Sequence, residues 1–266
     1  MNLQPEEIST DFMDALRAEA DATREGHACV CKGKEYLPLA NGLVKTCECG
    51  KRKAIHSALA KAGVPRGYFD LTLSRDWHLR QDADGNDLGP MAMDQKKIIG
   101  YFVAKYIKAF RIMAAGEMIS IEPRKGVNIR TNSLLLMGSR RSGRTLLAAV
   151  IAKHVMLDQF SMRFFDWSVD IAPAVNDFDS REAMDELAYE FEHRDLIVID
   201  GVFNDDVNSR ALPRNLDRLA RARLRVRKPT VITGDYSVLD MKAGEGWKSL
   251  LDQCYQISLP NGLSHK

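Results

Sequence analysis

Residues 134–145 read Leu-Leu-Leu-Met-Gly-Ser-Arg-Arg-Ser-Gly-Arg-Thr, an apolar run, a glycine-bounded loop and the start of an apolar, helix-forming stretch. This order predicts a strand over Ser133–Met137, a phosphate loop and a helix over Arg144–Leu157, which point backbone N–H groups and a helix N-terminus at a phosphate. Arginine stands at position 144, where the pattern has lysine. The alternative is a chance match in a plain strand–turn–helix, but the flanking segments favour a phosphate loop. We assign nucleotide binding to Gly138, Ser142, Gly143, Arg144 and Thr145.

A second apolar run, Asp195–Asp200, ends in a carboxylate. In a phosphate-loop protein such a carboxylate holds Mg²⁺ beside the loop threonine, so Asp200 joins the nucleotide-binding residues. The next residue is Gly201, where an acid that orients the attacking water is usual. Asp235 follows the predicted fourth strand, where its charge would repel a γ-phosphate. We expect ATP or ADP with Mg²⁺ to bind and hydrolysis to be slow or absent, so the sequence leaves open whether the chain is an enzyme.

The segments around the loop alternate between apolar strands and helices, as in a protein with a parallel sheet. This predicts an α/β fold. Strands are expected at 133–137, 161–167, 196–199, 229–233 and 254–259, and helices at 93–115, 144–157, 180–192 and 212–224.

Composition sets the broad class of the chain. Its 266 residues are 45% hydrophobic and 28% charged, which suits one medium domain and a small appendage. The net charge of +2 gives no argument for nucleic-acid binding. No stretch reaches the roughly 20 apolar residues of a membrane span, and the acidic N-terminus is unlike a signal peptide. We expect a cytoplasmic protein without a membrane partner, whose cysteines are reduced.

Four of the five cysteines form two closely spaced pairs, Cys29-Val-Cys31 and Cys47-Glu-Cys49. Two thiolate pairs supply the four ligands that a tetrahedral Zn²⁺ prefers. The surrounding segment has too few apolar residues for a core, so metal binding would supply its folding free energy. The alternative is four free cysteines that pair only in sequence. We predict a structural zinc site made by Cys29, Cys31, Cys47 and Cys49.

The N-terminal region is predicted to be a separate module. Residues 6–24 form an amphipathic helix, because Ile8, Phe12 and Leu16 fall four residues apart. The cysteine segment and a basic helix over residues 51–61 follow, and Gly63-Val-Pro65 ends that helix. We therefore divide the chain into an N-terminal helix plus zinc module, residues 1–62, and a phosphate-loop domain, residues 63–266.

A row of arginines follows one side of the predicted helix over residues 212–224. Arg214, Arg218, Arg221 and Arg225 are spaced four, three and four residues apart. Arg223, Arg227 and Lys228 add to this patch. A basic stripe of this density can follow a phosphate backbone. The alternative is a solvated helix face paired with the acidic residues 177–192.

The order of these motifs resembles the DnaC/DnaI-type replicative helicase loaders, which are grouped with the IstB transposition helper ATPases. The resemblance covers nearly the whole chain. It implies an AAA+ (RecA-like) parallel sheet preceded by a partner-binding module. The matching segments are the N-terminal helix and cysteine module, Ala62-Gly-Val-Pro-Arg66, Gln95…Tyr106…Phe110, Leu135-Leu-Met-Gly138 and Lys228-Pro-Thr-Val-Ile-Thr233.

The chain departs from this family at four positions of the nucleotide site. The family has lysine in the loop, an acid after the strand-end aspartate, asparagine at the sensor position and a Ser-Arg whose arginine reaches a neighbouring subunit's ATP. The corresponding residues here are Arg144, Gly201, Asp235 and Ser249-Leu250.

The resemblance implies a DNA-replication protein of a phage or mobile element. It implies binding to the replicative DNA helicase through residues 1–62, contact with single-stranded DNA and association with further copies of the chain. Two alternatives remain at this stage: an IstB-like ATPase that helps DNA transposition, and an inhibitor that sequesters a host helicase or loader.

Overall fold

The computed structural model describes residues 34, 36–39, 43–77, 89–124, 127–139, 141–177, 181–202, 212–240 and 243–260. The predicted helix over residues 6–24 and the first cysteine pair, Cys29 and Cys31, lie outside the described residues.

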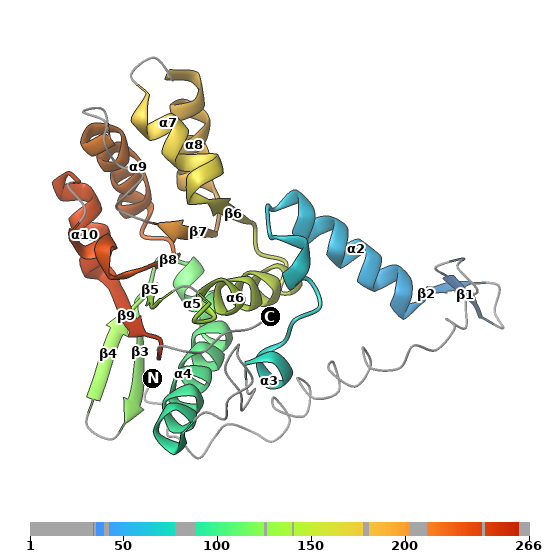
Figure 1. The fold of residues 1–266 in the computed structure, drawn as a ribbon. Coiled ribbons are helices and arrows are strands. Elements are labelled where there is room, and N and C mark those ends of the chain that lie inside the picture. Colours follow the sequence, from blue (N-terminus) through green and yellow to red (C-terminus); the bar gives the residue numbers. More distant parts are fainter. Residues whose placement is uncertain are drawn as a thin grey trace.

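A five-stranded parallel sheet forms the centre of the molecule (Figure 1). The strands in the middle of this sheet have side chains that are buried on both of its faces, which is typical of parallel sheets. The order across the sheet is β6 (Met162–Asp166), β7 (Leu196–Val202), β8 (Thr230–Gly234), β5 (Ser133–Met137) and β9 (Cys254–Ser258).

Helices cover both faces of this sheet and create two apolar cores (Figure 1). α4 (Pro90–Lys108) and α6 (Arg144–Leu157) pack on the face that includes Leu134 and Leu136 of β5. The opposite face, with Leu135 and Met137, is covered by a set of four helices. These are α7 (Ala172–Asn176), α8 (Arg181–His193), α9 (Leu212–Val226) and α10 (Glu245–Gln253).

The predicted strands and helices agree with the matching elements to within a few residues, with one correction, and the structure also contains elements that were not predicted. The single helix expected over residues 93–115 is two helices, α4 and α5 (Phe110–Ala114), which meet at Ala109. These additions include the antiparallel hairpin of β3 (Ile119–Arg124) and β4 (Val127–Thr131), the π-helix η3 (Trp167–Ile171), α7 and α10.

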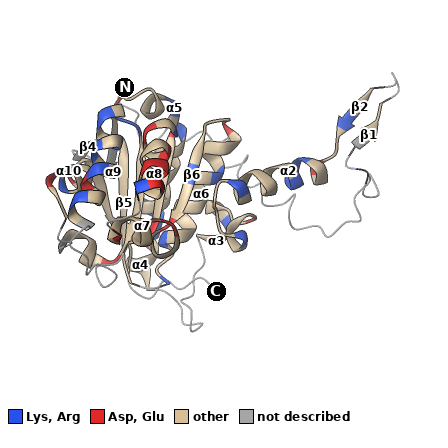
Figure 2. Ribbon diagram, turned by 90° about the horizontal axis from the view of Figure 1, so that it is seen from above, with Lys and Arg blue, Asp and Glu red and all other residues tan. Residues whose placement is uncertain are grey.

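An arm projects from this body (Figures 1 and 2). It consists of the antiparallel pair β1 (Tyr36–Pro38) and β2 (Val44–Thr46), followed by α2 (Glu48–Lys61). The base of the arm is bound to the sheet, because the Phe164 N–H donates a 2.7 Å hydrogen bond to the Ala62 carbonyl. Leu59 and Ala62 are also part of the main core, so the division between residues 62 and 63 stays a prediction.

After the arm, a short segment crosses the body before α4. It contains the 3-10 helix η2 (Arg66–Tyr68) and α3 (Leu73–Asp76). Among the described residues no helix is long and apolar enough to span a membrane.

Candidate nucleotide site and basic cleft

The phosphate loop leaves β5 at the carboxyl edge of the sheet and enters α6. Gly143 precedes α6 with φ +89°, a conformation that favours glycine. Gly138 has no room for a side chain, because a Cβ there would lie 2.6 Å from the Ser142 hydroxyl oxygen. That hydroxyl is buried and has no hydrogen-bond partner among the described residues. The loop therefore keeps a polar group and a helix N-terminus directed at a site for an anion.

Arg144 takes the position of the usual lysine and is 7% exposed. Burial lowers the pKa of its guanidinium, while Asp200 and Asp235 oppose this effect through their negative charges. The arginine thus keeps a cation at the site, between two carboxylates rather than extended into solvent.

Asp200, at the end of the third predicted strand, contacts the phosphate loop directly. The Thr145 hydroxyl lies 3.0 Å from both of its carboxylate oxygens, and the Thr233 hydroxyl donates a 2.6 Å hydrogen bond to it. Burial raises the pKa of Asp200; the two threonine hydrogen bonds oppose this rise, and the negative charge of its strand neighbour Asp166 adds to it. A threonine hydroxyl beside a strand-end carboxylate is the pair of groups that holds Mg²⁺ in phosphate-loop proteins.

Gly201 differs from an acidic residue in backbone as well as in side chain. Its φ is +77°, and its N–H donates a 2.9 Å hydrogen bond to the Thr233 hydroxyl. The pairing of β7 with β8 shifts register between Ile199 and Val202. Residues other than glycine rarely adopt this left-handed backbone conformation. The backbone at position 201 therefore disfavours the acidic residue that would orient the attacking water.

The remaining family positions have structural roles in this chain. The Asp235 carboxylate accepts hydrogen bonds from the backbone N–H, at 2.8 Å, and the hydroxyl of Ser237, which fix it at the end of β8. Leu250 is 2% exposed in α10 and belongs to the second core. A side chain that faces the core cannot reach a neighbouring subunit.

Tyr68 is a site residue that the sequence did not identify. It ends η2, which packs against α6, the helix that contains Thr145. Burial raises the pKa of Tyr68, the nearby charge of Asp200 raises it further, and the Thr145 side chain opposes the rise. The only signal in the sequence was the neighbouring Ala62–Arg66 segment of the resemblance.

These groups fit a nucleotide with Mg²⁺. The buried Ser142 hydroxyl, the glycine-bounded loop and Arg144 suit phosphate oxygens, and Thr145 with Asp200 suits the metal. The arrangement provides binding groups and a cation, and it lacks the carboxylate that Gly201 replaces.

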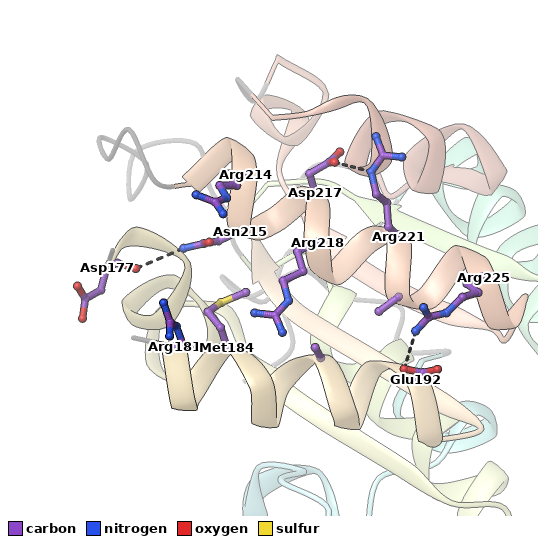
Figure 3. A pocket seen from close by; sticks show the side chains of 12 residues that line it. Asp177, Arg181, Met184, Glu192, Arg214, Asn215, Asp217, Arg218, Arg221 and Arg225 are labelled. Carbon is purple, nitrogen blue, oxygen red and sulfur yellow. Dashed lines mark hydrogen bonds and ion pairs between the residues drawn. The ribbon is translucent and has the colours of Figure 1, made fainter. Parts of the chain in front are cut away.

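The four stripe arginines line a cleft of about 790 Å³ between α8 and α9 (Figure 3). Two of them bond to α8: Arg218 to Asp185, and Arg225 to Glu192 at 2.7 Å. Arg221 bonds instead to Asp217 of its own helix at 2.6 Å, on the side away from α8 (Figure 3). Arg214 and, from α8, Arg181 also line the cleft. Both interpretations of the stripe thus have structural support, since the cleft is rich in arginine and three of the guanidinium groups are ion-paired.

The assignment of Arg223 to this surface patch is wrong. The side chain is 1% exposed, and its guanidinium donates to the carbonyls of Phe191, Arg194, Asp195 and Pro229. Burial lowers its pKa to about 9, so it stays charged at neutral pH. It joins the ends of α8 and β8, which is a structural role.

Only the second predicted zinc pair lies in the described residues. Cys47 is buried at the start of α2, directly after β2, and Cys49 lies in the first turn of that helix. The described residues contain no group of three metal-binding side chains, and the other two predicted ligands, Cys29 and Cys31, are outside them. Cys254, by contrast, is buried in β9.

Comparison with solved structures shows the fold of the chain. A DnaI crystal structure matches with a TM-score of 0.50 and 15% identity over 68% of this chain and 92% of that one. A crystal structure of the DnaC helicase loader has a TM-score of 0.46 and 14% identity, with 70% and 99% covered. AMPPCP-bound DnaA from Aquifex aeolicus has a TM-score of 0.48 and 12% identity, with 69% and 52% covered.

The chain spans about half the length of the replication-initiator structures that it matches. No protein-family model and no curated protein matches the sequence. At these identities the likeness to DnaI concerns the fold alone, and together with the observed topology it confirms the predicted α/β fold with its parallel sheet.

Proposed function

We propose that this chain is a helicase-loader-like protein of DNA replication that binds ATP or ADP with Mg²⁺ and hydrolyses it slowly or not at all. The observation that carries this proposal is the contrast within one site. The Thr145–Asp200 pair beside the phosphate loop is intact, while the adjacent Gly201 has neither a carboxylate nor a backbone suited to one. In this proposal the site therefore has the groups that bind nucleotide and lacks a group that its hydrolysis needs.

The DnaI-like fold supports the loader assignment, and both DnaI and DnaC structures are covered nearly completely by the match. In this proposal the N-terminal region, with its arm, binds the replicative DNA helicase. The body contacts single-stranded DNA or further copies of the chain. A zinc ion held by Cys29, Cys31, Cys47 and Cys49 would make the start of α2 rigid, which suits a docking platform.

The arginine-lined cleft supports the DNA contact. Arg181, Arg214 and Arg218 approach it from two helices (Figure 3), so a phosphate backbone in the cleft would meet positive charge on both sides. The ion pairs to Asp185 and Glu192 oppose such binding, because phosphates must compete with these carboxylates.

The proposed slow hydrolysis is tested by measuring steady-state phosphate release from ATP in the presence of a replicative helicase and single-stranded DNA. We expect turnover far below one per second for the natural chain. A Gly201→Glu variant should stay equally slow, because φ +77° strains any side chain there. Turnover near one per second in the natural chain would contradict the proposal and favour a working ATPase.

A further inference from the structure

The end of β8 lies between the two parts of the nucleotide site. In the sheet, β8 is flanked by β5, which leads into the phosphate loop, and by β7, which carries Asp200. On the first side, the Gly138 N–H donates a 3.3 Å hydrogen bond to the Gly234 carbonyl. On the second side, the Thr233 hydroxyl donates to the Asp200 carboxylate. The next residue, Asp235, therefore leaves the sheet between the phosphate loop and Asp200.

The Asp235 carboxylate is fixed at this point and keeps one oxygen available. The two hydrogen bonds from Ser237 both end on Oδ1. Oδ2 has no hydrogen-bond partner within the part of the chain that the structure describes. The charge of Asp235 acts on the loop residue Arg144, because together with Asp200 it opposes the fall in the pKa of that guanidinium. A negative charge is therefore held beside the phosphate loop.

A second carboxylate, that of Asp166, lies on the other side of Asp200. The two residues are register partners in the parallel pair of β6 and β7. Phe164 and Val198, two positions before them, both face the core that α6 covers. Side chains two positions apart in a strand share a face, so Asp166 and Asp200 also face α6. The negative charge of Asp166 adds to the rise in the pKa of Asp200, which agrees with this placement.

These positions bear on the third phosphate of a nucleotide more than on the first two. The N–H groups of a phosphate loop hold the α- and β-phosphates, and here the buried Ser142 hydroxyl is close to the same loop. The γ-phosphate lies further along, where Mg²⁺ bridges it to the β-phosphate beside the strand-end carboxylate. That place is next to Asp200 and hence between Asp166 and Asp235. Like charges repel there, and the positive charge of Arg144 is already shared with two carboxylates.

We propose that the nucleotide site is specific for a nucleoside diphosphate with Mg²⁺, because Asp235, with a smaller contribution from Asp166, disfavours the γ-phosphate. This inference rests on the proposed nucleotide binding and names the class of nucleotide that the site takes. The γ-phosphate is the group that distinguishes ATP from ADP, so a site of this kind stays in its diphosphate-bound state when ATP is added.

The test is displacement of a fluorescent ADP analogue from the full chain in Mg²⁺, by ADP and by AMPPCP, a triphosphate that is not hydrolysed. The natural chain should bind ADP about 10-fold more tightly than AMPPCP, or more. Asp235→Asn removes the charge and keeps an amide oxygen for the Ser237 bonds. It should tighten AMPPCP about 5- to 20-fold and change ADP binding less. Asp166→Asn should act in the same direction with a smaller effect.

Asp158→Asn is the matched control, because it makes the same charge change at the exposed C-terminal end of α6, away from the loop. It should leave the ratio of the two affinities unchanged. If the natural chain binds AMPPCP as tightly as ADP, the specificity is overturned while nucleotide binding stands. If it prefers ADP and Asp235→Asn keeps the same ratio, the role of Asp235 is overturned. If neither nucleotide displaces the analogue, or the analogue does not bind, the proposed nucleotide binding fails and the specificity fails with it.

Discussion

The hydroxyl of Thr145 and the carboxylate of Asp200 are hydrogen-bonded at 3.0 Å across the gap between α6 and β7. Thr145 is the second residue of the helix after the phosphate loop, and Asp200 lies near the carboxyl end of β7, which is two positions from β5 in the sheet. Their contact is the arrangement on which the proposed Mg²⁺ binding depends, and it lies beside Gly201, which has no carboxylate.

Asp200→Asn tests this pair. We expect affinity for nucleotide with Mg²⁺ to fall about tenfold or more, because an amide replaces the anionic ligand. Binding in EDTA should change little. The thermal stability should be kept, since burial already raises the pKa of Asp200 and an amide oxygen can accept from Thr145 and Thr233. Asp195→Asn is the control, because Asp195 directly precedes β7 at the end of the strand away from the site, and it should leave nucleotide affinity unchanged.

Asp200 also gives that affinity a pH dependence. Its raised pKa means that a proton competes with Mg²⁺ at higher pH than for an ordinary aspartate. Binding with Mg²⁺ should therefore weaken as the pH falls, and a titration of Asp200→Asn should lose this dependence. A natural chain whose affinity is flat with falling pH would contradict the assignment of Asp200 to the metal.

Lys96 should make stability depend on pH in the alkaline range. It is buried in α4 with its ammonium 5.1 Å from the Trp77 ring, and burial lowers its pKa from 10.5 to about 8. The folded chain thus binds fewer protons than the unfolded chain between these values, so this group makes stability rise from pH 8 to 10.5. Below pH 8 the lysine is charged in the folded and in the unfolded chain, so burial of its charge lowers the stability by the full amount.

Lys96→Met should therefore raise the melting temperature at pH 7 and have a smaller effect near pH 10.5. Lys97→Met is the matched control, because Lys97 is 66% exposed and pairs with Asp94 on the same helix. It should shift the melting temperature little at either pH. A Lys96→Met variant that is less stable at pH 7 would show that the contacts of the ammonium outweigh its burial cost.

The sheet and its loop were predictable because their signals are local. β5 and α6 begin and end at the residues that the apolar pattern indicates. The position of Tyr68 was not predictable, since it depends on how the segment after the arm folds back over α6. The hairpin of β3 and β4 was missed although its signal is also local, because residues 119–122 and 127–130 alternate between apolar and polar side chains on either side of a turn.

Arg223 shows a different kind of error. It lies seven residues after Leu216 and four after Leu219, both of which are buried, so helical spacing places it on the inner face of α9. Its charge suggested a surface position, while the carbonyls at the ends of α8 and β7 supply the acceptors that make burial tolerable. Periodicity was the better guide.

Single-stranded DNA binding should depend on which arginines face the cleft. Arg214→Ala and Arg218→Ala should each weaken binding several-fold and reduce the slope of log affinity against log salt by about 0.7. Arg221→Ala should have a smaller effect, because Arg221 lines the cleft but its guanidinium is bonded to Asp217 on the side of α9 away from α8 (Figure 3). Fluorescence anisotropy of a labelled oligonucleotide measures both quantities. If all three variants bind as the natural chain does, the stripe is an ion-paired helix surface.

Purified chain should contain one zinc per molecule. Elemental analysis measures this directly. Cys47→Ser should abolish zinc binding and unfold the start of the arm, since Cys47 is buried there. The body should keep its melting transition because its two cores are formed by other elements. Cys254→Ser is the control and should retain the metal. A metal-free chain with a folded arm would show four ordinary thiols.

Binding to the replicative helicase should depend on the N-terminal helix predicted over residues 6–24. Phe12→Ala and Leu16→Ala shorten its apolar side, which has too few residues for a core but enough for a groove on a partner. In the full chain each should weaken capture of a replicative helicase about tenfold, and Asp11→Ala, beside them in sequence, should not. The competing outcome is that this helix packs on its own body. In that case the two variants lower the melting temperature of the body and leave helicase capture unchanged. If the natural chain captures no helicase, the loader assignment itself is wrong. If the Phe12→Ala and Leu16→Ala variants lose capture and keep their stability, the docking surface lies before the arm.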